Sequence, residues 1–140
     1  MTWRAVGAVA LVVPAVLGLG ACGSSKKSSP PAPAVVDMRN QKHVAISAQN
    51  NQFSPLDVEV SPGTTVMWTN HDSVAHNVQK SADAVDFGAP FGVQAGDFGP
   101  GQTYAFTFTK VGEFHYTCTI HTLMNGTVRV VATTASPTTS

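Results

Sequence analysis

The chain is poor in charged residues, has only two cysteines and has no segment with the sustained periodicity of a helix. Charged residues make up 11% of the 140 residues, and Lys plus Arg balance Asp plus Glu at eight each. The sequence therefore lacks the concentrated positive charge with which proteins bind nucleic acid. It also lacks the Gly-x-Ser-x-Gly and His-Glu-x-x-His patterns of serine hydrolases and zinc proteases. These absences argue against nucleic-acid binding and against hydrolytic activity.

The neutral total hides an uneven distribution of charge. Lys26, Lys27 and Arg39 precede the segment that we expect to fold, residues 42–132. That segment carries four basic and seven acidic residues, a net charge of −3 with histidine neutral. The apolar fraction of the chain, 43%, is enough for a packed core in one domain.

The first cysteine lies in an N-terminal targeting segment. Arg4 is followed by an apolar stretch, and Leu19-Gly20-Ala21-Cys22 ends that stretch with small residues. This pattern predicts an export signal over residues 1–21. The four residues resemble the lipobox of bacterial lipoproteins, which predicts a lipidated Cys22 and attachment to the outer face of the cytoplasmic membrane or to the periplasmic side. A plain signal peptide or an uncleaved anchor is the alternative, although the apolar stretch is shorter than the roughly 20 residues of a membrane span.

The composition divides the remainder of the chain into three parts. Residues 22–41 are rich in Ser, Pro and Lys and predict a flexible tether. Residues 42–132 form the expected domain, and the Thr- and Ser-rich residues 133–140 predict a disordered tail. A Cys22–Cys118 disulfide would tie the tether to the domain. We favour separate roles for the two cysteines, lipid attachment at Cys22 and metal binding at Cys118.

Within the expected domain, apolar and polar residues alternate with the period of a half-buried β-strand. The apolar positions are Val58 and Val60; Val66 and Trp68; Tyr104, Phe106 and Phe108; Phe114, Tyr116 and Cys118; and Val128 and Val130. Turn-forming residues occur at 61–63, 99–101 and 125–126. Short strands without helices predict an all-β fold, an antiparallel β-sandwich, with an irregular edge at residues 81–98.

Four residues form a candidate metal site. Cys118, His121 and Met124 follow one another at three-residue spacing, directly after a predicted strand that points Cys118 inward. His76, at the predicted end of another strand, is the expected fourth ligand. Each residue alone has an ordinary structural explanation, since buried cysteine and methionine are common core residues. Together, a thiolate, two imidazoles and a thioether predict a copper site of the blue electron-transfer type.

The remaining histidines do not fit this set. The alternation that turns Cys118 inward turns His115 outward, and His43 and His71 lie in segments expected at the surface. We expect none of the three to bind the metal.

The sequence around these ligands resembles the cupredoxin family, within it the amicyanin, pseudoazurin and plastocyanin group. The resemblance covers roughly residues 43–131 and is carried by three segments: Ser61–Asn70, His76-Asn77-Val78, and Gly112–Val128 with its short Cys-x-x-His-x-x-Met loop. It implies a Greek-key β-sandwich with one type 1 copper bound by His76, Cys118, His121 and Met124.

The resemblance also implies roles for residues beside the ligands. The backbone N–H of Asn77 is expected to donate a hydrogen bond to the Cys118 sulfur. Ile120 replaces the proline common in amicyanin-like proteins, so its N–H is a candidate second donor. His121 is expected at the rim of an apolar patch for partner docking, to which Leu123 and Phe91 contribute.

These residues leave three classes of function to compare. An electron carrier is favoured, because four protein ligands close the metal shell whereas catalytic metals keep an open position. A module for copper storage, delivery or sensing is the alternative. An enzyme is not expected, since a multicopper oxidase needs more histidines and a binuclear centre needs two cysteines in the loop. We expect a monomer whose redox protein partners the sequence does not identify.

Overall fold

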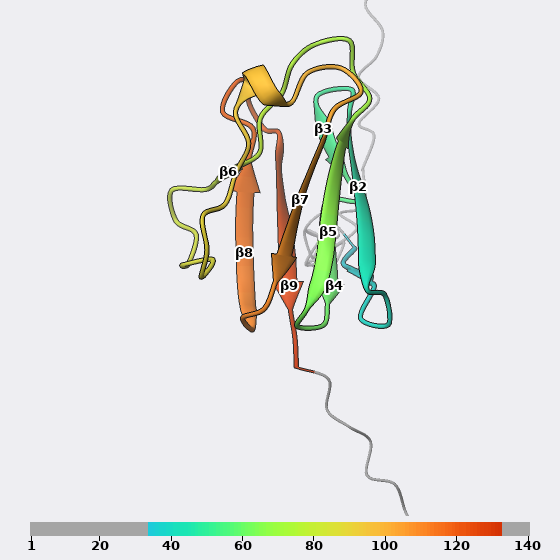
Figure 1. The fold of residues 1–140 in the computed structure, drawn as a ribbon, viewed down its shortest axis with the longest axis vertical. Helices are drawn as coiled ribbons and strands as arrows, with labels where there is room; N and C mark the ends of the chain where they lie inside the picture. The colour runs from blue at the N-terminus through green and yellow to red at the C-terminus, as the bar shows by residue number, and fades with distance from the viewer. Residues whose placement is uncertain (1–33, 133–140) are drawn as a thin grey trace, which may run out of the picture. The chain divides into compact units, whose positions relative to one another are not determined.

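The computed structural model describes residues 34–132, which fold into two packed β-sheets (Figure 1). The five-stranded sheet has the order β1 (Val36–Asp37), β4 (Asp57–Val60), β9 (Asn125–Val130), β8 (Gly112–Thr117) and β6 (Gln79–Lys80). The four-stranded sheet has the order β3 (Gln52–Ser54), β2 (His43–Gln49), β5 (Thr64–Asn70) and β7 (Thr103–Phe108). A short 3-10 helix spans Ala95–Asp97. The predicted all-β sandwich is confirmed, and no helix in residues 34–132 is long and apolar enough to cross a membrane.

The sheets are mixed, so the prediction of an antiparallel sandwich needs correction for three of the strand pairs. Strands β1 and β4, β4 and β9, and β2 and β5 pair in parallel. The reason is that the chain changes sheet at every step except those from β2 to β3 and from β8 to β9. Neighbours within a sheet therefore come from distant parts of the sequence and are free to run in the same direction.

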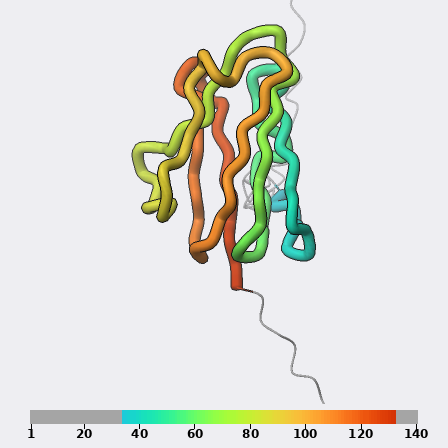
Figure 2. The backbone as a smooth tube through the Cα atoms, viewed as in Figure 1, coloured from blue at the N-terminus to red at the C-terminus, as the bar shows by residue number. Residues whose placement is uncertain are grey.

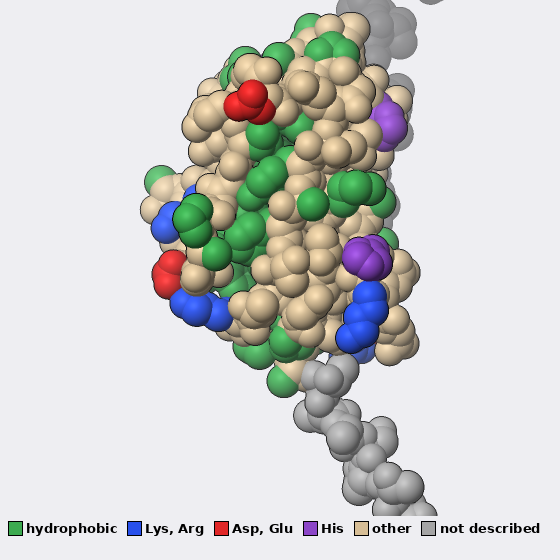
Figure 3. Space-filling view, in the orientation of Figure 1, with side chains coloured by type: hydrophobic (Ala, Val, Ile, Leu, Met, Phe, Trp, Pro, Cys, Tyr) green, Lys and Arg blue, Asp and Glu red, His purple; other side chains and the backbone are tan. Residues whose placement is uncertain are grey.

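The core forms where the inward faces of the two sheets meet. The predicted alternation is confirmed: Val66 and Trp68 of β5 are buried, while Met67 between them is 43% exposed. The Trp68 ring packs edge-on against Tyr116, with ring centroids 5.2 Å apart. Half-buried aromatic rings, Phe91, Tyr104 and Phe106, pack against this core from the side. Figure 3 shows apolar side chains reaching the surface along the seam between β7 and β8.

The folded region begins earlier than the sequence predicted. Residues 34–41 belong to the predicted tether, yet Val36 and Asp37 pair with β4 and the Met38 N–H donates to the Glu59 carbonyl at 2.8 Å. Two residues are too few to produce a recognisable period, so only the neighbouring strand reveals β1. The predicted signal, Cys22 and the tail at 133–140 lie outside the described residues.

The predicted turn at Asn125-Gly126 is wrong, because both residues begin β9 and pair with Thr117 and Tyr116 of β8. Residues 118–124 make the connection instead. Position 126 requires glycine because neighbouring groups pack closely against its backbone. A Cβ there would collide with the Tyr116 phenol and lie 2.9 Å from the Leu56 carbonyl oxygen. Residues 81–98 are irregular, as expected, with one isolated bridge between Val78 and Val93.

Candidate metal centre

The loop between β8 and β9 holds three of the predicted ligands. It continues the inward alternation of β8, so Cys118 is 2% exposed, and Met124 at its far end is 1% exposed. The Cys118 N–H donates to the Met124 carbonyl at 2.8 Å, and the Thr117 hydroxyl donates to the same carbonyl at 3.1 Å. These bonds close the loop at its base and hold its two buried ends side by side.

His76 reaches the loop from the segment that follows β5. It lies in a connection without regular secondary structure, two residues before the isolated bridge at Val78, and not at a strand end, which corrects the prediction. The His76 N–H donates to the Phe98 carbonyl at 3.2 Å, and the buried Asn70 amide donates to the carbonyls of Val74 and Phe98. These contacts pin the segment over the end of the sandwich, where residues 71–78 and 118–124 meet (Figure 2).

Three donor atoms converge at this end. The Nδ1 atoms of His76 and His121 lie 3.0 Å apart, and the Cys118 Sγ lies 3.9 Å from the first and 3.7 Å from the second. A metal about 2.0 Å from each nitrogen and about 2.3 Å from the sulfur would place the ligand atoms roughly 3 to 4 Å apart. His76 is fully buried and Cys118 nearly so. The arrangement therefore fits one metal ion bound by two imidazoles and a thiolate.

Asp72, which the sequence reasoning missed, orients the buried imidazole. Its carboxylate lies 2.8 Å from His76 Nε2, on the side of the ring away from the other ligands. An Nε2–H directed at this carboxylate leaves the Nδ1 lone pair facing Cys118 and His121, the tautomer that a metal ligand requires. The four-residue spacing from Asp72 to His76 was visible in the sequence, but no strand or helix pattern there made it informative.

The Asp72 carboxylate is itself held by the turn between β2 and β3. The backbone N–H groups of Asn50 and Asn51 donate to it at 2.7 Å and 3.0 Å. The hydrogen bonds from Asn51, Asn50 and His76 lower the pKa of Asp72, so the group stays ionised. The β2–β3 turn, Asp72 and His76 thus form one connected chain of hydrogen bonds that ends at the metal centre.

Replacing Asp72 with Asn should weaken binding of Cu(II), the ion that the ligand set predicts, and raise the midpoint potential of the bound metal. The neutral amide accepts a weaker hydrogen bond from His76, which makes the imidazole a poorer donor and favours Cu(I). Loss of such a partner typically costs about 10- to 100-fold in metal affinity. Competition titration with a chelator and voltammetry would measure the two effects. Asp97→Asn, at an exposed carboxylate of the 3-10 helix, is the matched control, and equal effects from both variants would contradict this role of Asp72.

The contacts of Asn77 and Ile120 differ from those predicted for them. Within residues 34–132 no hydrogen bond joins the N–H of Asn77 or Ile120 to the Cys118 sulfur. The Asn77 side chain instead accepts from the Thr119 N–H and donates to the Thr119 hydroxyl, both at 2.8 Å. It therefore fastens the His76 segment to the ligand loop. Ile120 is 48% exposed.

The two residues of the predicted partner patch lie in different surroundings. Leu123 is 91% exposed in the ligand loop, and it adopts a positive φ of 66°. Phe91 belongs to the irregular 81–98 segment, and its ring packs against Phe87 and Trp68 with centroids 4.2 Å and 5.8 Å away. Phe91 is therefore a half-buried residue that packs against the hydrophobic core. Among the remaining histidines, His43 and His71 are exposed, and His115 points away from the metal centre toward Thr127, 3.2 Å away.

Comparison with known proteins agrees with this reading of the fold and site. Residues 40–131 match the family described as copper-binding proteins of the plastocyanin/azurin family. The match covers well over half of the chain. The chain therefore belongs to the plastocyanin/azurin family of copper-binding proteins, and the metal of this centre is copper.

Within that family the chain is similar to amicyanins. It is 30% identical over 87 residues to amicyanin from Paracoccus denitrificans, which covers 62% of this chain and 64% of the relative. Amicyanin-alpha from Methylorubrum extorquens is 34% identical over 83 residues, 56% of this chain and 64% of the relative. The chain thus spans a little under two thirds of the length of these relatives.

Solved structures share the fold. A purple cupredoxin from Nitrosopumilus maritimus superposes with a TM-score of 0.53 at 30% identity, over 63% of this chain and 99% of that chain. A Cu-containing nitrite reductase from Thermus scotoductus gives a TM-score of 0.56 at 33% identity, over 63% of this chain but 22% of that chain. The second likeness is confined to a small part of a much longer protein.

Proposed function

We propose that this chain is an exported, membrane-tethered type 1 copper protein that carries single electrons between redox partners and has no enzymatic activity of its own. The observation that carries the proposal is the convergence of His76 Nδ1, His121 Nδ1 and Cys118 Sγ in a buried position. Bound copper would supply the Cu(I)/Cu(II) couple.

The protein's part is to hold its ligands nearly unchanged in both oxidation states. Cys118 and Met124 lie at the two hydrogen-bonded ends of one short loop. His76 is fixed by Asp72 on its outer side and by the Phe98 carbonyl at its backbone. Met124, buried in the same loop, is the proposed fourth ligand and would supply a thioether sulfur. A shell of this kind leaves no position for a substrate, which supports electron transfer over catalysis.

The visible spectrum and midpoint potential of the copper-loaded protein test this proposal. An intense blue band that disappears on reduction and returns on reoxidation is expected. A colourless copper complex that releases its metal readily to a chelator would instead indicate storage, delivery or sensing. The burial of His76 and Cys118 favours retention of the metal, because a site that exchanges copper must open to a donor or acceptor.

Membrane attachment is proposed to depend on Cys22. Replacing Cys22 with Ala should move the protein from the membrane to the soluble fraction, because acyl chains contribute about 0.8 kcal/mol per buried CH₂. Cell fractionation with immunodetection would measure the shift, and copper binding should be unaffected. An unchanged membrane fraction would favour an uncleaved N-terminal anchor.

A further inference from the structure

The chain contains an asparagine followed by glycine directly after the predicted ligand Met124. None of its five other asparagines precedes a glycine. The backbone nitrogen of the residue after an asparagine can attack the carbon of the side-chain amide, and glycine hinders that attack least because it has no side chain. Asn125-Gly126 is therefore the place in this sequence where that reaction, deamidation, is chemically easiest.

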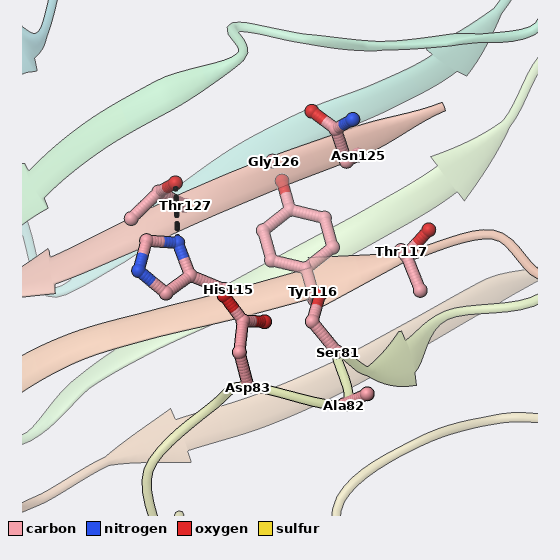
Figure 4. Close-up of a pocket in the computed structure, with 9 residues that line it drawn as sticks. All are labelled: Ser81, Ala82, Asp83, His115, Tyr116, Thr117, Asn125, Gly126 and Thr127. Carbon is pink, nitrogen blue, oxygen red and sulfur yellow. Dashed lines mark hydrogen bonds between the residues drawn. The ribbon is translucent and has the colours of Figure 1, made fainter. Parts of the chain in front are cut away.

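The side chain of Asn125 is open to water, whereas the backbone of Gly126 is closely packed. Asn125 is exposed at the start of β9, and its carboxamide makes no hydrogen bond within residues 34–132. Together with Thr117 it lines a polar pocket of about 400 Å³ between the turn after β6 and the strands β8 and β9 (Figure 4). Gly126 is buried against the phenol of Tyr116. Water thus reaches the asparagine, but the closed strand restrains Gly126.

The hydrogen-bond ladder between β8 and β9 holds the attacking nitrogen. The Cys118 N–H donates to the Met124 carbonyl at 2.8 Å, so these two residues form a hydrogen-bonded pair. Such pairs alternate along two antiparallel strands with pairs that exchange no hydrogen bonds. Gly126, opposite Tyr116, occupies the next hydrogen-bonded position. Its N–H must leave the ladder before the nitrogen can reach the Asn125 amide.

The ligand loop that leads into β9 is loosely held. Leu123 is 91% exposed and has a φ of 66°, a value that bulky side chains rarely adopt. The Met124 N–H donates to the His121 carbonyl at 3.5 Å, longer than an ordinary hydrogen bond. The bonds from Cys118 and Thr117 to the Met124 carbonyl fasten the loop base. Local opening of the sheet should therefore begin at this end of β9.

Bound copper should suppress this opening. Three of the four predicted ligands, Cys118, His121 and Met124, belong to the loop. A metal held by all three joins the two ends of the loop, and a ligand that binds only the closed form shifts the equilibrium toward that form. The metal-free protein is consequently the form in which the strand opens and Asn125 becomes reactive.

We propose that Asn125 is a site of deamidation controlled by copper occupancy. In the opened metal-free protein the Gly126 nitrogen bonds to the side-chain carbon of Asn125, the bond to the amide nitrogen breaks, and ammonia leaves with the Gly126 proton. Water then opens the resulting succinimide at either carbonyl and leaves an aspartate or an isoaspartate at position 125. Water is consumed, ammonia is released and no atom changes oxidation state. The proposal rests on metal binding by the loop and not on electron transfer.

The isoaspartate product should damage the copper site. It routes the main chain through the former side chain, which adds a carbon atom to the backbone between Met124 and Gly126. The strand cannot take up this length at Gly126, because an added Cβ there would collide with the Tyr116 phenol and lie 2.9 Å from the Leu56 carbonyl oxygen. The extra length must therefore displace Met124, whose carbonyl closes the loop. A chain that stays without copper would thus lose its binding site permanently.

The first test follows deamidation of the full-length chain, metal-free and copper-loaded, without oxygen at mildly alkaline pH. Peptide mapping by mass spectrometry measures the replacement of amide nitrogen by oxygen at each asparagine. The metal-free form should react at position 125 at least about tenfold faster than the copper form. Exposed Asn51, which precedes a glutamine, should stay unmodified. Equal rates in the two forms, or reaction at Asn51 before Asn125, would overturn the proposal.

Two variants test the role of the loop. Thr117→Val removes the hydroxyl that donates to the Met124 carbonyl at 3.1 Å, and the metal-free form should then react about two- to tenfold faster, the effect of one lost hydrogen bond. Thr103→Val, at an exposed threonine of β7, is the matched control and should react at the wild-type rate. An unchanged rate in Thr117→Val, or an equal gain in both variants, would contradict opening at the loop.

The second test separates the change of backbone from the added charge. The isoaspartate form, isolated by chromatography, should bind copper at least about tenfold more weakly than the unmodified chain in a competition titration with a chelator. Asn125→Asp carries the same new carboxylate on a normal backbone and should bind copper within about threefold of the wild type, because the side chain is exposed. Equal copper affinities of the isoaspartate form and Asn125→Asp would overturn the proposed damage to the site.

Discussion

Copper-loaded protein in which Cys118 is replaced by Ser should be colourless. The intense visible band of a type 1 site comes from charge transfer between thiolate sulfur and Cu(II), and a serine hydroxyl supplies no comparable donor. In the structure Cys118 provides the one sulfur among the three converging donor atoms. The imidazoles of His76 and His121 would remain in place, so weak Cu(II) binding should persist while the band is lost. Absorption spectroscopy of the Cu(II) form measures this directly.

The chain offers a matched control, because Cys22 is its only other cysteine. Cys22→Ser should retain the full band. A Cys118→Ser protein that keeps an intense visible band would show that the copper is bound elsewhere, and the assignment of the centre would have to be abandoned.

Replacing Gly126 with Ala should destabilise the domain by about 3 kcal/mol, at the upper end of the cost of overpacking a core. The added Cβ would collide with the phenol of Tyr116 and lie 2.9 Å from the Leu56 carbonyl oxygen. Tyr116 is fully buried, and its ring packs against those of Trp68 and Phe53. For a domain of about 100 residues this loss corresponds to roughly 12 to 24 °C in melting temperature. Calorimetry of the metal-free protein would measure it.

Gly96→Ala is the control for this substitution. A Cβ at position 96 would meet no atom within 4 Å, and the residue does not need a positive φ. Its melting temperature should stay close to that of the wild type. If the two variants melted together, the close approach of β9 to Tyr116 would not be a determinant of stability.

The sequence alone was sufficient to predict the ligand loop and the class of fold. Cys118, His121 and Met124 are neighbours in the chain, so their spacing already constrains their separation in space. The alternation in Val66, Trp68, Phe114 and Tyr116 likewise depends on local geometry, because successive side chains of a strand face opposite ways. Both features are present in the structure because they depend on local geometry and not on contacts between distant segments.

The tertiary structure decided everything that depends on segments brought together from far apart. Asp72 matters only because the β2–β3 turn and the imidazole of His76 lie against it. The parallel pairing of β2 with β5 arises from a chain that changes sheets, and the short β1 exists only through its pairing with β4. The pocket beside Thr117 likewise forms where β6, β8 and β9 adjoin. A local pattern records which way a side chain points, whereas the identity of its neighbour is set by the packing of the whole domain.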